Sequence, residues 1–558
     1  GLNYQPTEHL NAVLKYTKGK SDPRSYQAIT EGSIPISPDQ SVDFVGYSRP
    51  SSYDRDEIAI DRPGDTDVDV DVATLTMTYE GDSYNIVSVT GWYDASYRNE
   101  NDTDSTPLRL LESDFRAKTD AFSQDIRYVS EFDGPFNFIV GAYYGEEDSQ
   151  YKTVFPAYVS PNILQTFGID PVLGDLFQGF GAADVRYKTV KESLAIYGQA
   201  RYEITDLLGL DVGLRYTEDE AKINYSNVSQ LTSDLQPVGS WVPGNPTGVD
   251  SPFIPPAFDP NGVGFYAVGP YTLESGPTYS ADESEPTGRV SLDYALADEM
   301  MVYGSYSRGY RSGSFNGAGF WTARPLDLMY AKPEYVDAYE IGFKGDFFEN
   351  RLRVNSAMFF YDYEDQQFST VEGVAPIIKN AGKSEITGAE VEILAQPLLD
   401  TEMTLGLSFG WLDSEYKDLV LPDISTDDPA DELQLAGNQL TGAPEYSFSF
   451  KYDQYFSMKE WGTLLVHFDG SWRDKQWFTA YNDLAGNEAL RQDAYWLFNG
   501  RLSLSFGENE DYTIATWVRN LADEEYTVYA VNLQSAYGFN SFTPGAPRTY
   551  GIELSYQF

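Results

Sequence analysis

The residue types that most often carry catalysis are scarce in this chain of 558 residues, which has two histidines and no cysteine. Without cysteine, a thiolate nucleophile and a thiolate metal site are both excluded. His9 lies in a predicted turn and His467 inside a predicted strand, so a structural role is expected for each. The 86 acidic residues are too numerous for any pair to stand out as an acid–base couple. The sequence predicts a protein that is not an enzyme and has no catalytic residues.

Two acidic segments offer the oxygen ligands that Ca²⁺ prefers. They contain Asp65, Asp67 and Asp69 in the first, and Asp423, Asp427 and Asp428 in the second. Alternating aspartates on a strand share one face, so they converge on an ion only if a loop supplies further ligands. Neither segment has EF-hand spacing. Two interpretations stay open: bound Ca²⁺, or an acidic surface in water.

Aromatic residues are concentrated in the long segments between predicted strands. Those that could bind a ligand are Trp241, Phe265, Tyr266, Phe320, Trp321, Trp477 and Tyr481. Aromatic faces beside polar groups suit sugars or aromatic chelators. The alternative is that these rings pack against one another, because large loops need a core of their own to fold.

The formal net charge of −48 restricts the partners. Nucleic acid is excluded as a partner, since the phosphate backbone demands a basic face. The same charge disfavours an anionic ligand, because it repels anions over a long range. It suits an outer surface bathed in divalent cations, or a saline habitat.

Alternation of apolar and polar residues is the main structural signal, and the last segment shows it best. From Ala546 to Phe558, Tyr550, Ile552 and Leu554 point one way and the polar residues the other. Nineteen such strands are predicted, at Gly1–Gln5, Leu10–Lys18, Val70–Glu80, Tyr84–Tyr97, Asp120–Glu131, Phe136–Tyr151, Lys188–Glu203, Leu210–Asn224, Thr287–Leu296, Met301–Arg308, Val336–Phe347, Leu352–Tyr363, Ser384–Ala395, Met403–Tyr416, Pro444–Tyr455, Gly462–Trp472, Tyr495–Phe506, Tyr512–Tyr526 and Ala546–Phe558.

Short turns alternate with long connections along the chain, such as 19–69, 156–187, 226–286 and 309–335. Transmembrane barrels have this rhythm, with short periplasmic turns and long extracellular loops. In Leu210–Tyr216, Asp211 and Arg215 share a face, which would be costly in a soluble core but not in a wet lumen. The prediction is an all-β, transmembrane antiparallel β-barrel. An edge strand of a soluble sheet is the alternative for the last segment alone.

The direction of the strands gives a further expectation. The first and last predicted strands both run toward the short-turn side, so the chain would begin outside the membrane. Bacterial single-chain barrels have even strand numbers. If the amino-terminus belongs in the periplasm, an odd number of earlier strands is missing. Adding three earlier strands to the nineteen would give twenty-two, the number of the plugged transporters. The closing strand is then expected to have one edge without a partner and not to pair with Gly1–Gln5.

Several motifs in the second half of the chain occur together in one order. They are Tyr306–Asn316 with Arg308, Gly309 and Asn316, Lys332–Glu334, Tyr339–Lys344, Asn355–Tyr363, Asn380–Gly382, Gly388–Glu392, the run Asn520-Leu521-Ala522-Asp523-Glu524-Glu525-Tyr526, and the terminal Phe558. In this order the sequence resembles the TonB-dependent receptor family over its whole length. The terminal Phe558 resembles the signal read by the barrel assembly machinery.

The resemblance implies a single barrel domain, residues 1–558, that lacks the family's amino-terminal plug and about three first strands. It implies active import across the outer membrane of a Gram-negative bacterium. A scarce nutrient, such as an iron chelate or a glycan, would bind at the extracellular loops, and the TonB–ExbB–ExbD complex would act through the missing segment. Outer-membrane lipid, lipopolysaccharide and a surface lipoprotein are further expected partners. The alternatives are a passive channel and a surface adhesin or receptor scaffold.

Overall fold

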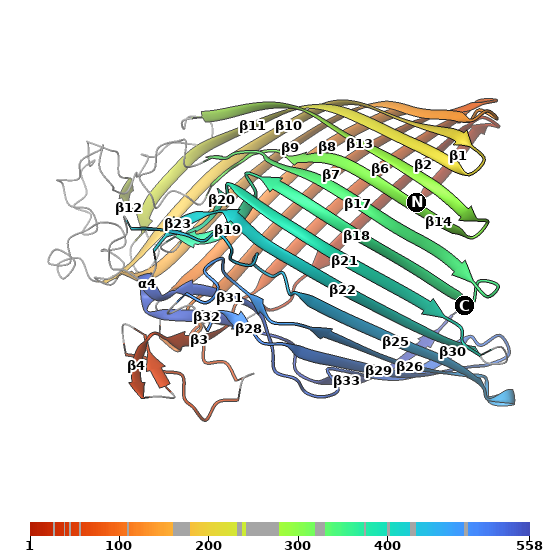
Figure 1. Cartoon of the computed structure of the whole chain (residues 1–558). Coiled ribbons are helices and arrows are strands. Elements are labelled where there is room, and N and C mark those ends of the chain that lie inside the picture. The colour runs from red at the N-terminus through yellow and green to blue at the C-terminus, as the bar shows by residue number, and fades with distance from the viewer. Residues whose placement is uncertain are drawn as a thin grey trace.

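The structure, a computed structural model, describes residues 1–557 apart from 26–27, 38–39, 44–45, 55–56, 109–110, 160–178, 232–236, 241–277, 318–329, 373–374, 399–401, 424–430 and 485–488. One large antiparallel sheet of nineteen long strands dominates it and curves into a barrel wall (Figure 1). The alternation of the sequence thus predicted both the fold class and the strand number.

The wall strands pair in chain order, each antiparallel to the next. They are β1 (Leu2–Thr7), β2 (Leu10–Ser21), β6 (Thr66–Glu80), β7 (Tyr84–Asp102), β8 (Glu112–Ser130), β9 (Phe136–Val159), β10 (Gly179–Thr205), β11 (Leu208–Leu231), β13 (Thr278–Ala297), β14 (Met300–Arg311), β17 (Glu334–Phe347), β18 (Leu352–Glu364), β21 (Lys383–Ala395), β22 (Met403–Asp418), β25 (Tyr446–Ser457), β26 (Thr463–Arg473), β29 (Tyr495–Phe506), β30 (Tyr512–Arg519) and β33 (Thr549–Tyr556). The short β12 (Pro237–Ser240) pairs with the end of β11.

The two faces of the wall differ as the alternation predicts. Ile196 and Leu214 are 63% and 69% exposed on the outer face, although both are large and apolar. Apolar side chains in such exposure need a lipid environment. Arg215 follows Leu214 on β11 and points to the opposite, inner face, where it lies against tyrosine rings.

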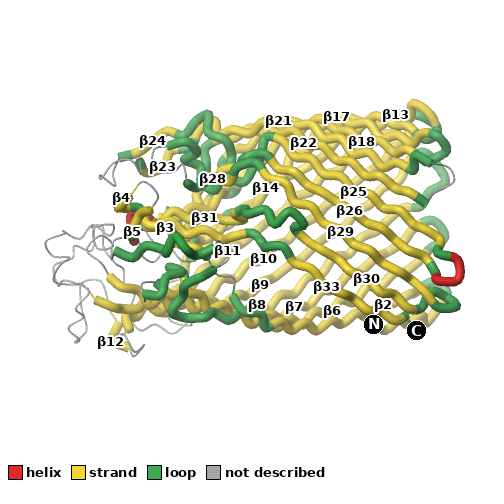
Figure 2. The backbone as a smooth tube through the Cα atoms, turned by 90° about the horizontal axis from the view of Figure 1, so that it is seen from below, coloured by secondary structure: helices red, strands yellow, loops and turns green. Residues whose placement is uncertain are grey.

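Short turns join the strands at one end of the barrel, and the long connections gather at the other (Figure 2). The turn between β17 and β18 contains Phe348, Glu349 and Asn350, all with positive φ. Both chain termini lie toward the short-turn end (Figures 1 and 2). The expectation that the chain begins outside the membrane is therefore wrong, because β1 has only 6 residues before the short turn and starts within the wall. No helix of the described residues is long and apolar enough to cross a membrane.

Many strand bounds differ from those predicted, and most of these strands are longer. β8 begins at Glu112 and not at Asp120. β9 and β10 extend into the ends of the connection predicted at 156–187, and β11 and β13 into the ends of that at 226–286, because their backbones continue to pair above the wall. β30 ends at Arg519 and not at Tyr526, since Asn520 has φ +50° and turns the chain out of the sheet.

The first and last strands each have one partner among the described strands. β33 pairs with β30 and β1 pairs with β2, while no register joins β33 to β1. The edge expected for the closing strand is therefore confirmed in this structure. Tyr550 on β33 is 80% exposed, in keeping with an edge position.

Short elements fold the long connections into a layer above the wall. They are β3 (Ile29–Gly32), β4 (Ile34–Ser37), β5 (Gln40–Val42), β15 (Ser314–Phe315), β16 (Tyr330–Ala331), β19 (Gln367–Glu372), β20 (Ala375–Asn380), β23 (Val420–Pro422), β24 (Glu432–Gln434), β27 (Gln476–Trp477), β28 (Arg491–Gln492), β31 (Thr527–Leu533), α4 (Gln534–Tyr537) and β32 (Phe539–Pro544), with the 3₁₀ turn η2 (Lys459–Trp461) at the opposite end. β3 pairs with β32, which joins the first long connection to the last.

The loop layer has an apolar core of its own. Tyr416, Leu419, Leu421 and Leu435 are buried together in it. Ala381 and Ala480 belong to the same core and come from two other connections, so the core holds three connections together.

Candidate functional site

The inner face of the wall is hollowed where small residues align across neighbouring strands. One hydrogen-bonded row runs Gly91, Ser123, Gly145 and Ser193 from β7 to β10, and continues to Asp219 on β11 and Glu283 on β13. Gly145 gives room to the ring of Tyr143, whose hydroxyl oxygen would lie 2.5 Å from a Cβ at residue 145. The row forms the floor of a depression in the wall.

The next inward-facing row toward the loops borders this depression, and together they form a partly open cavity of about 480 Å³. Its members are Tyr93, Ala121, Glu147, Lys191, Ala221 and Ala281. The volume lies within the range of small-molecule sites. Tyr143 and Tyr330 also line the cavity, so with Tyr93 its lining contains three tyrosines.

The outer face of the same strands shows where the cavity lies relative to the membrane. Leu194 and Leu214 are exposed and apolar, whereas Glu146, Glu192 and Glu220 follow on the outer face toward the loops. Carboxylates on the outer face require water, so the bilayer ends below them. The cavity consequently lies at the extracellular end of the lumen.

The segment after β14 reaches into the cavity and is held there by carboxylates. The hydroxyl of Tyr330 donates to Glu283, whose Oε2 also accepts the backbone N–H of Gly313 at 3.0 Å. A Cβ at residue 313 would lie 2.1 Å from the Tyr330 hydroxyl oxygen, so glycine is required for this approach. Tyr310 donates to Asp219 in the same way. Burial, together with Glu283, raises the pKa of Tyr330 and keeps its hydroxyl protonated.

Below the cavity the lumen carries both signs of charge. The guanidinium of Arg215 lies 5.6 Å and 5.8 Å from the ring centres of Tyr143 and Tyr197. Tyr197 donates to Asp125 at 2.7 Å. Nearer the short turns, Arg201 forms ion pairs with Glu203, Asp211 and Asp293. The expectation of lumen-facing charge around Asp211 and Arg215 is met.

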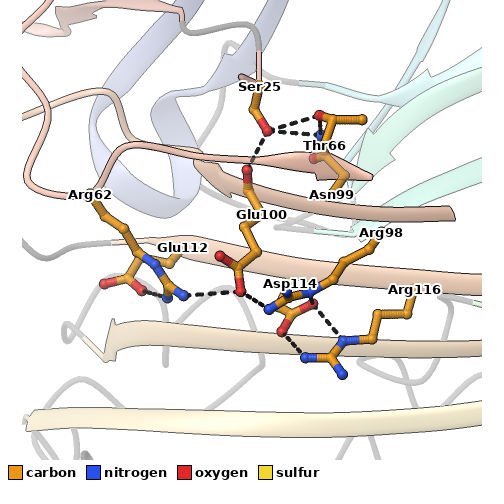
Figure 3. Close-up of polar contacts among 9 residues, drawn as sticks. All are labelled: Ser25, Arg62, Thr66, Arg98, Asn99, Glu100, Glu112, Asp114 and Arg116. Atoms are coloured by element: carbon orange, nitrogen blue, oxygen red, sulfur yellow. Dashed lines mark hydrogen bonds and ion pairs between the residues drawn. The ribbon is translucent and has the colours of Figure 1, made fainter. Parts of the chain in front are cut away.

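A second polar constellation lies on the outer wall above the membrane and is drawn in Figure 3. Six side chains alternate in charge, in the order Glu112, Arg62, Glu100, Arg98, Asp114 and Arg116. Arg62 comes from the connection between β2 and β6, and the other five from β7 and β8. Its Nη1 lies 2.8 Å from Glu112 Oε2 and its Nη2 lies 3.3 Å from Glu100 Oε1. We name this chain of ion pairs the charge ladder.

Neutral hydrogen bonds beside the charge ladder hold the same connection against β7. The Ser25 hydroxyl donates to the carbonyl of Glu100 at 2.6 Å, and Asn99 Nδ2 donates to Ser25 Oγ and Thr66 Oγ1 at 3.1 Å and 2.9 Å. A Cβ on Gly64 would lie 2.1 Å from the Glu100 carbonyl oxygen. The first long loop is thus fastened tightly to the wall.

Two of the predicted ligand-binding aromatics are described by the structure, and both lie in the loop layer. Trp477 is 2% exposed, with Arg491 over its ring at 5.4 Å. Tyr481 packs on the loop core and donates to the carbonyl of Pro422 at 2.9 Å. Burial raises the pKa of Tyr481 to about 12. Both side chains pack the loops here, and a role in ligand binding stays a prediction. Trp241, Phe265, Tyr266, Phe320 and Trp321 lie outside the described residues.

The aspartates predicted to hold Ca²⁺ occupy two places. The backbone of Asp65 forms an isolated β-bridge with Arg24, and Asp67 lies opposite Arg98 in the strand register. The side chain of Asp69 forms an ion pair with Lys18 at 3.3 Å. Asp423 lies at the end of β23, while Asp427 and Asp428 lie outside the described residues. Across the described ranges, no group of three or more histidine, cysteine or acidic side chains could hold a metal ion. The Ca²⁺ site stays a prediction.

The motif residues serve the structure of the extracellular ends. Arg308 pairs with Asp337 at 2.6 Å, next to Gly309 on β14. Asn316 accepts from and donates to the backbone of Ile378, at 2.7 Å and 2.8 Å.

The later motif forms a turn after β30. Asn520 Nδ2 donates to the carbonyls of Glu524 and Ala546, and its Oδ1 accepts the N–H of Glu524. Leu521 follows it, Asp523 pairs with Arg548 at 3.1 Å, and Tyr526 stacks on Tyr495. Phe558 lies outside the described residues.

The two histidines have local partners. His9 Nδ1 lies 2.9 Å from the Glu80 carbonyl, at a short turn as predicted. Both ring nitrogens of His467 contact carboxylates, Asp453 at 2.6 Å and Asp469 at 3.0 Å. These contacts fit the structural role expected for each.

Sequence reasoning missed the cavity and the charge ladder. Gly91, Gly145, Asp219 and Glu283 are far apart in sequence and become one row only through the strand register. The alternation shows that each faces inward. No local pattern shows that they are neighbours.

A family model described as TonB dependent receptor-like, beta-barrel, matches residues 16–521. The ferric-pyoverdine 358 receptor of Pseudomonas putida is 28% identical over 295 residues, covering 52% of this chain and 32% of that protein. The pesticin receptor of Yersinia pestis is 22% identical over 344 residues, covering 61% of this chain and 40% of that protein. The matched part of the chain thus spans 32% and 40% of the length of these two relatives.

Solved structures share the fold. The ferric yersiniabactin uptake receptor of Yersinia pestis superposes with a TM-score of 0.67 at 17% identity, covering 99% of this chain and 68% of that one. A siderophore receptor of Acinetobacter baumannii gives 0.67 at 15% identity, covering 98% and 72%. Together with the match over residues 16–521, the apolar outer face and the polar lumen, these findings show that this chain belongs to the TonB-dependent receptor β-barrel family of the Gram-negative outer membrane.

Proposed function

We propose that this barrel is the transmembrane wall of an active importer that binds a scarce nutrient, an iron chelate in the first instance, and admits it with energy from the TonB system. The observation that carries the proposal is the cavity at the extracellular end of the lumen, where a ligand arriving from outside would first meet the inner wall. The relatives support an iron chelate, because they are receptors for ferric pyoverdine and ferric yersiniabactin.

The partners follow from the same proposal. The apolar outer face around Ile196 and Leu214 would contact lipid chains, and the acidic outer residues above it would lie at the level of lipopolysaccharide and its divalent cations. The TonB–ExbB–ExbD complex would supply the energy. We also propose that the extracellular loops contribute to ligand binding, that Ca²⁺ binds to the acidic segments, and that a surface lipoprotein is a partner. No step of bond chemistry is proposed for any residue.

Uptake by living cells tests the proposal. Cells with and without the receptor gene are grown with limiting iron and given radiolabelled ferric chelates. Receptor-dependent uptake that stops when TonB is deleted is the expected result. Uptake that persists without TonB, or a large and constantly open conductance of the receptor in planar bilayers, would instead establish a passive channel.

A further inference from the structure

The cavity in the inner wall has an unusual charge arrangement at its β11–β13 side. Asp219 and Glu283 are directly opposite each other in the strand register. Like charges in this relationship repel each other and destabilise a sheet. Glu147 lines the same cavity, and the basic residue in the lining of this cavity is Lys191. Three inward carboxylates thus face one ammonium group.

The described partners of Asp219 and Glu283 are neutral. Tyr330 and the Gly313 N–H donate to Glu283, and Tyr310 donates to one oxygen of Asp219. Neutral donors stabilise a carboxylate but do not cancel its charge. The pair therefore keeps a negative potential over the floor of the cavity, of which Gly145 and Ser193 are part.

Aromatic rings complete the cavity. Tyr93 and Tyr330 are in its lining, and the face of a tyrosine ring attracts cations. Opposed carboxylates in a cavity lined by tyrosine side chains suit an ammonium or guanidinium group. The same carboxylates would repel an anionic chelate.

From this cavity we infer that the imported ligand belongs to the class of chelates with a peripheral positive charge, which Asp219 and Glu283 recognise. The inference rests on the proposed function and names its substrate class. The cation relieves the repulsion between the two carboxylates, so its binding is favoured beyond a single ion pair. The net charge of −48 favours the approach of the same class of ligand.

A matched pair of probes tests the inference on the receptor purified from outer membranes. One probe is a linear ferric trihydroxamate with a terminal ammonium group, and the other is the same chelate after N-acetylation, which removes the charge. We expect the charged form to bind roughly tenfold more tightly at low salt, with the advantage falling as salt is raised.

Variants locate the effect. Asp219→Asn should remove most of the preference for the charged probe, and Glu283→Gln should reduce it, while Glu392→Gln on β21, an inward carboxylate distant from the cavity lining, should leave it unchanged. Asparagine at 219 keeps an oxygen that accepts from Tyr310. Glutamine at 283 keeps an oxygen for Tyr330 but loses the one that accepts the Gly313 N–H, so Asp219→Asn is the more decisive variant.

The outcomes separate the two proposals. Equal binding of both probes, or a preference for the charged probe that Asp219→Asn leaves intact, overturns the cationic class and leaves the importer standing. Absence of saturable binding of the charged probe, with TonB-dependent uptake of an anionic chelate, has the same consequence. If neither probe binds and no chelate is taken up, both proposals are wrong.

Discussion

Arg62 and Glu112 form an ion pair at 2.8 Å that joins the first long loop to the start of β8. Glu112 is only 3% exposed at its side chain, whereas Arg62 retains contact with solvent. The pair begins the charge ladder, which continues through Glu100 to Arg116. A buried carboxylate depends strongly on the cations that pair with it.

Replacing Arg62 with alanine should therefore open the loop locally. Removal of the guanidinium takes the Arg62 ion pair away from the buried Glu112 and from Glu100, at a cost of roughly 1–3 kcal/mol after discounting for the solvent contact of Arg62. Hydrogen exchange in residues 57–66 should become faster. Arg116→Ala, at the exposed end of the ladder, is the control and should change exchange there little. Equal protection in Arg62→Ala and the parent protein would contradict a role in fastening the loop.

Gly64 tests the same attachment through shape alone. A Cβ at this position would meet the Glu100 carbonyl oxygen at 2.1 Å, so Gly64→Ala must displace the segment. We expect a loss of roughly 1–3 kcal/mol, as for overpacking. Gly19→Ala is the matched control, because a Cβ there has nothing within 4 Å. Thermal unfolding of the two variants in detergent would compare them. A parent-like midpoint for Gly64→Ala would show that the loop has room to shift.

Asn520 combines a left-handed backbone with three hydrogen bonds, and two substitutions separate these contributions. Asn520→Gly keeps the backbone freedom and loses the side-chain bonds, each worth about 1 kcal/mol. Asn520→Ala loses both, because alanine is strained at φ +50°. The expected order of unfolding midpoints is parent, then glycine, then alanine. If the alanine variant matched the glycine variant, the positive φ would have no energetic weight.

Asp102 should make the extracellular end of β7 sensitive to pH. It is fully buried, and burial, followed by repulsion from Asp104, raises its pKa to about 8. Unfolded, the carboxyl loses its proton near pH 4. Between these values the folded state keeps a proton that the opened state has lost, so protection of the loop should fall as the pH rises from about 4 to 8 and then level off.

Hydrogen exchange of residues 102–108, corrected for the intrinsic pH dependence, measures this loss. Asp102→Asn carries no titrating proton and should show a flat profile, while it keeps an oxygen that accepts the Ser105 N–H. A parent profile as flat as that of the asparagine variant would show that Asp102 is ionised in the folded loop.

The sequence alone determined the wall of this protein. In Leu214-Arg215-Tyr216 the alternation assigns each side chain to lipid or to lumen, because strand geometry has a period of two and is local. The same reasoning predicted the nineteen strands and, through the motifs around Arg308 and Asn520, the family. It placed the end of β30 too late, because the positive φ of Asn520 depends on contacts with Ala546 across the turn.

The tertiary structure decided which inward residues meet. Asp219 and Glu283 become neighbours through the register of β11 and β13, and Arg62 reaches Glu112 only after the first long loop folds back on the wall. The sequence could not tell whether Trp477 is exposed or buried, and in the structure the surrounding loops bury its side chain. A strand's pattern fixes its faces, but register and loop packing come from hydrogen bonds and contacts between distant segments, on which the local sequence carries little information.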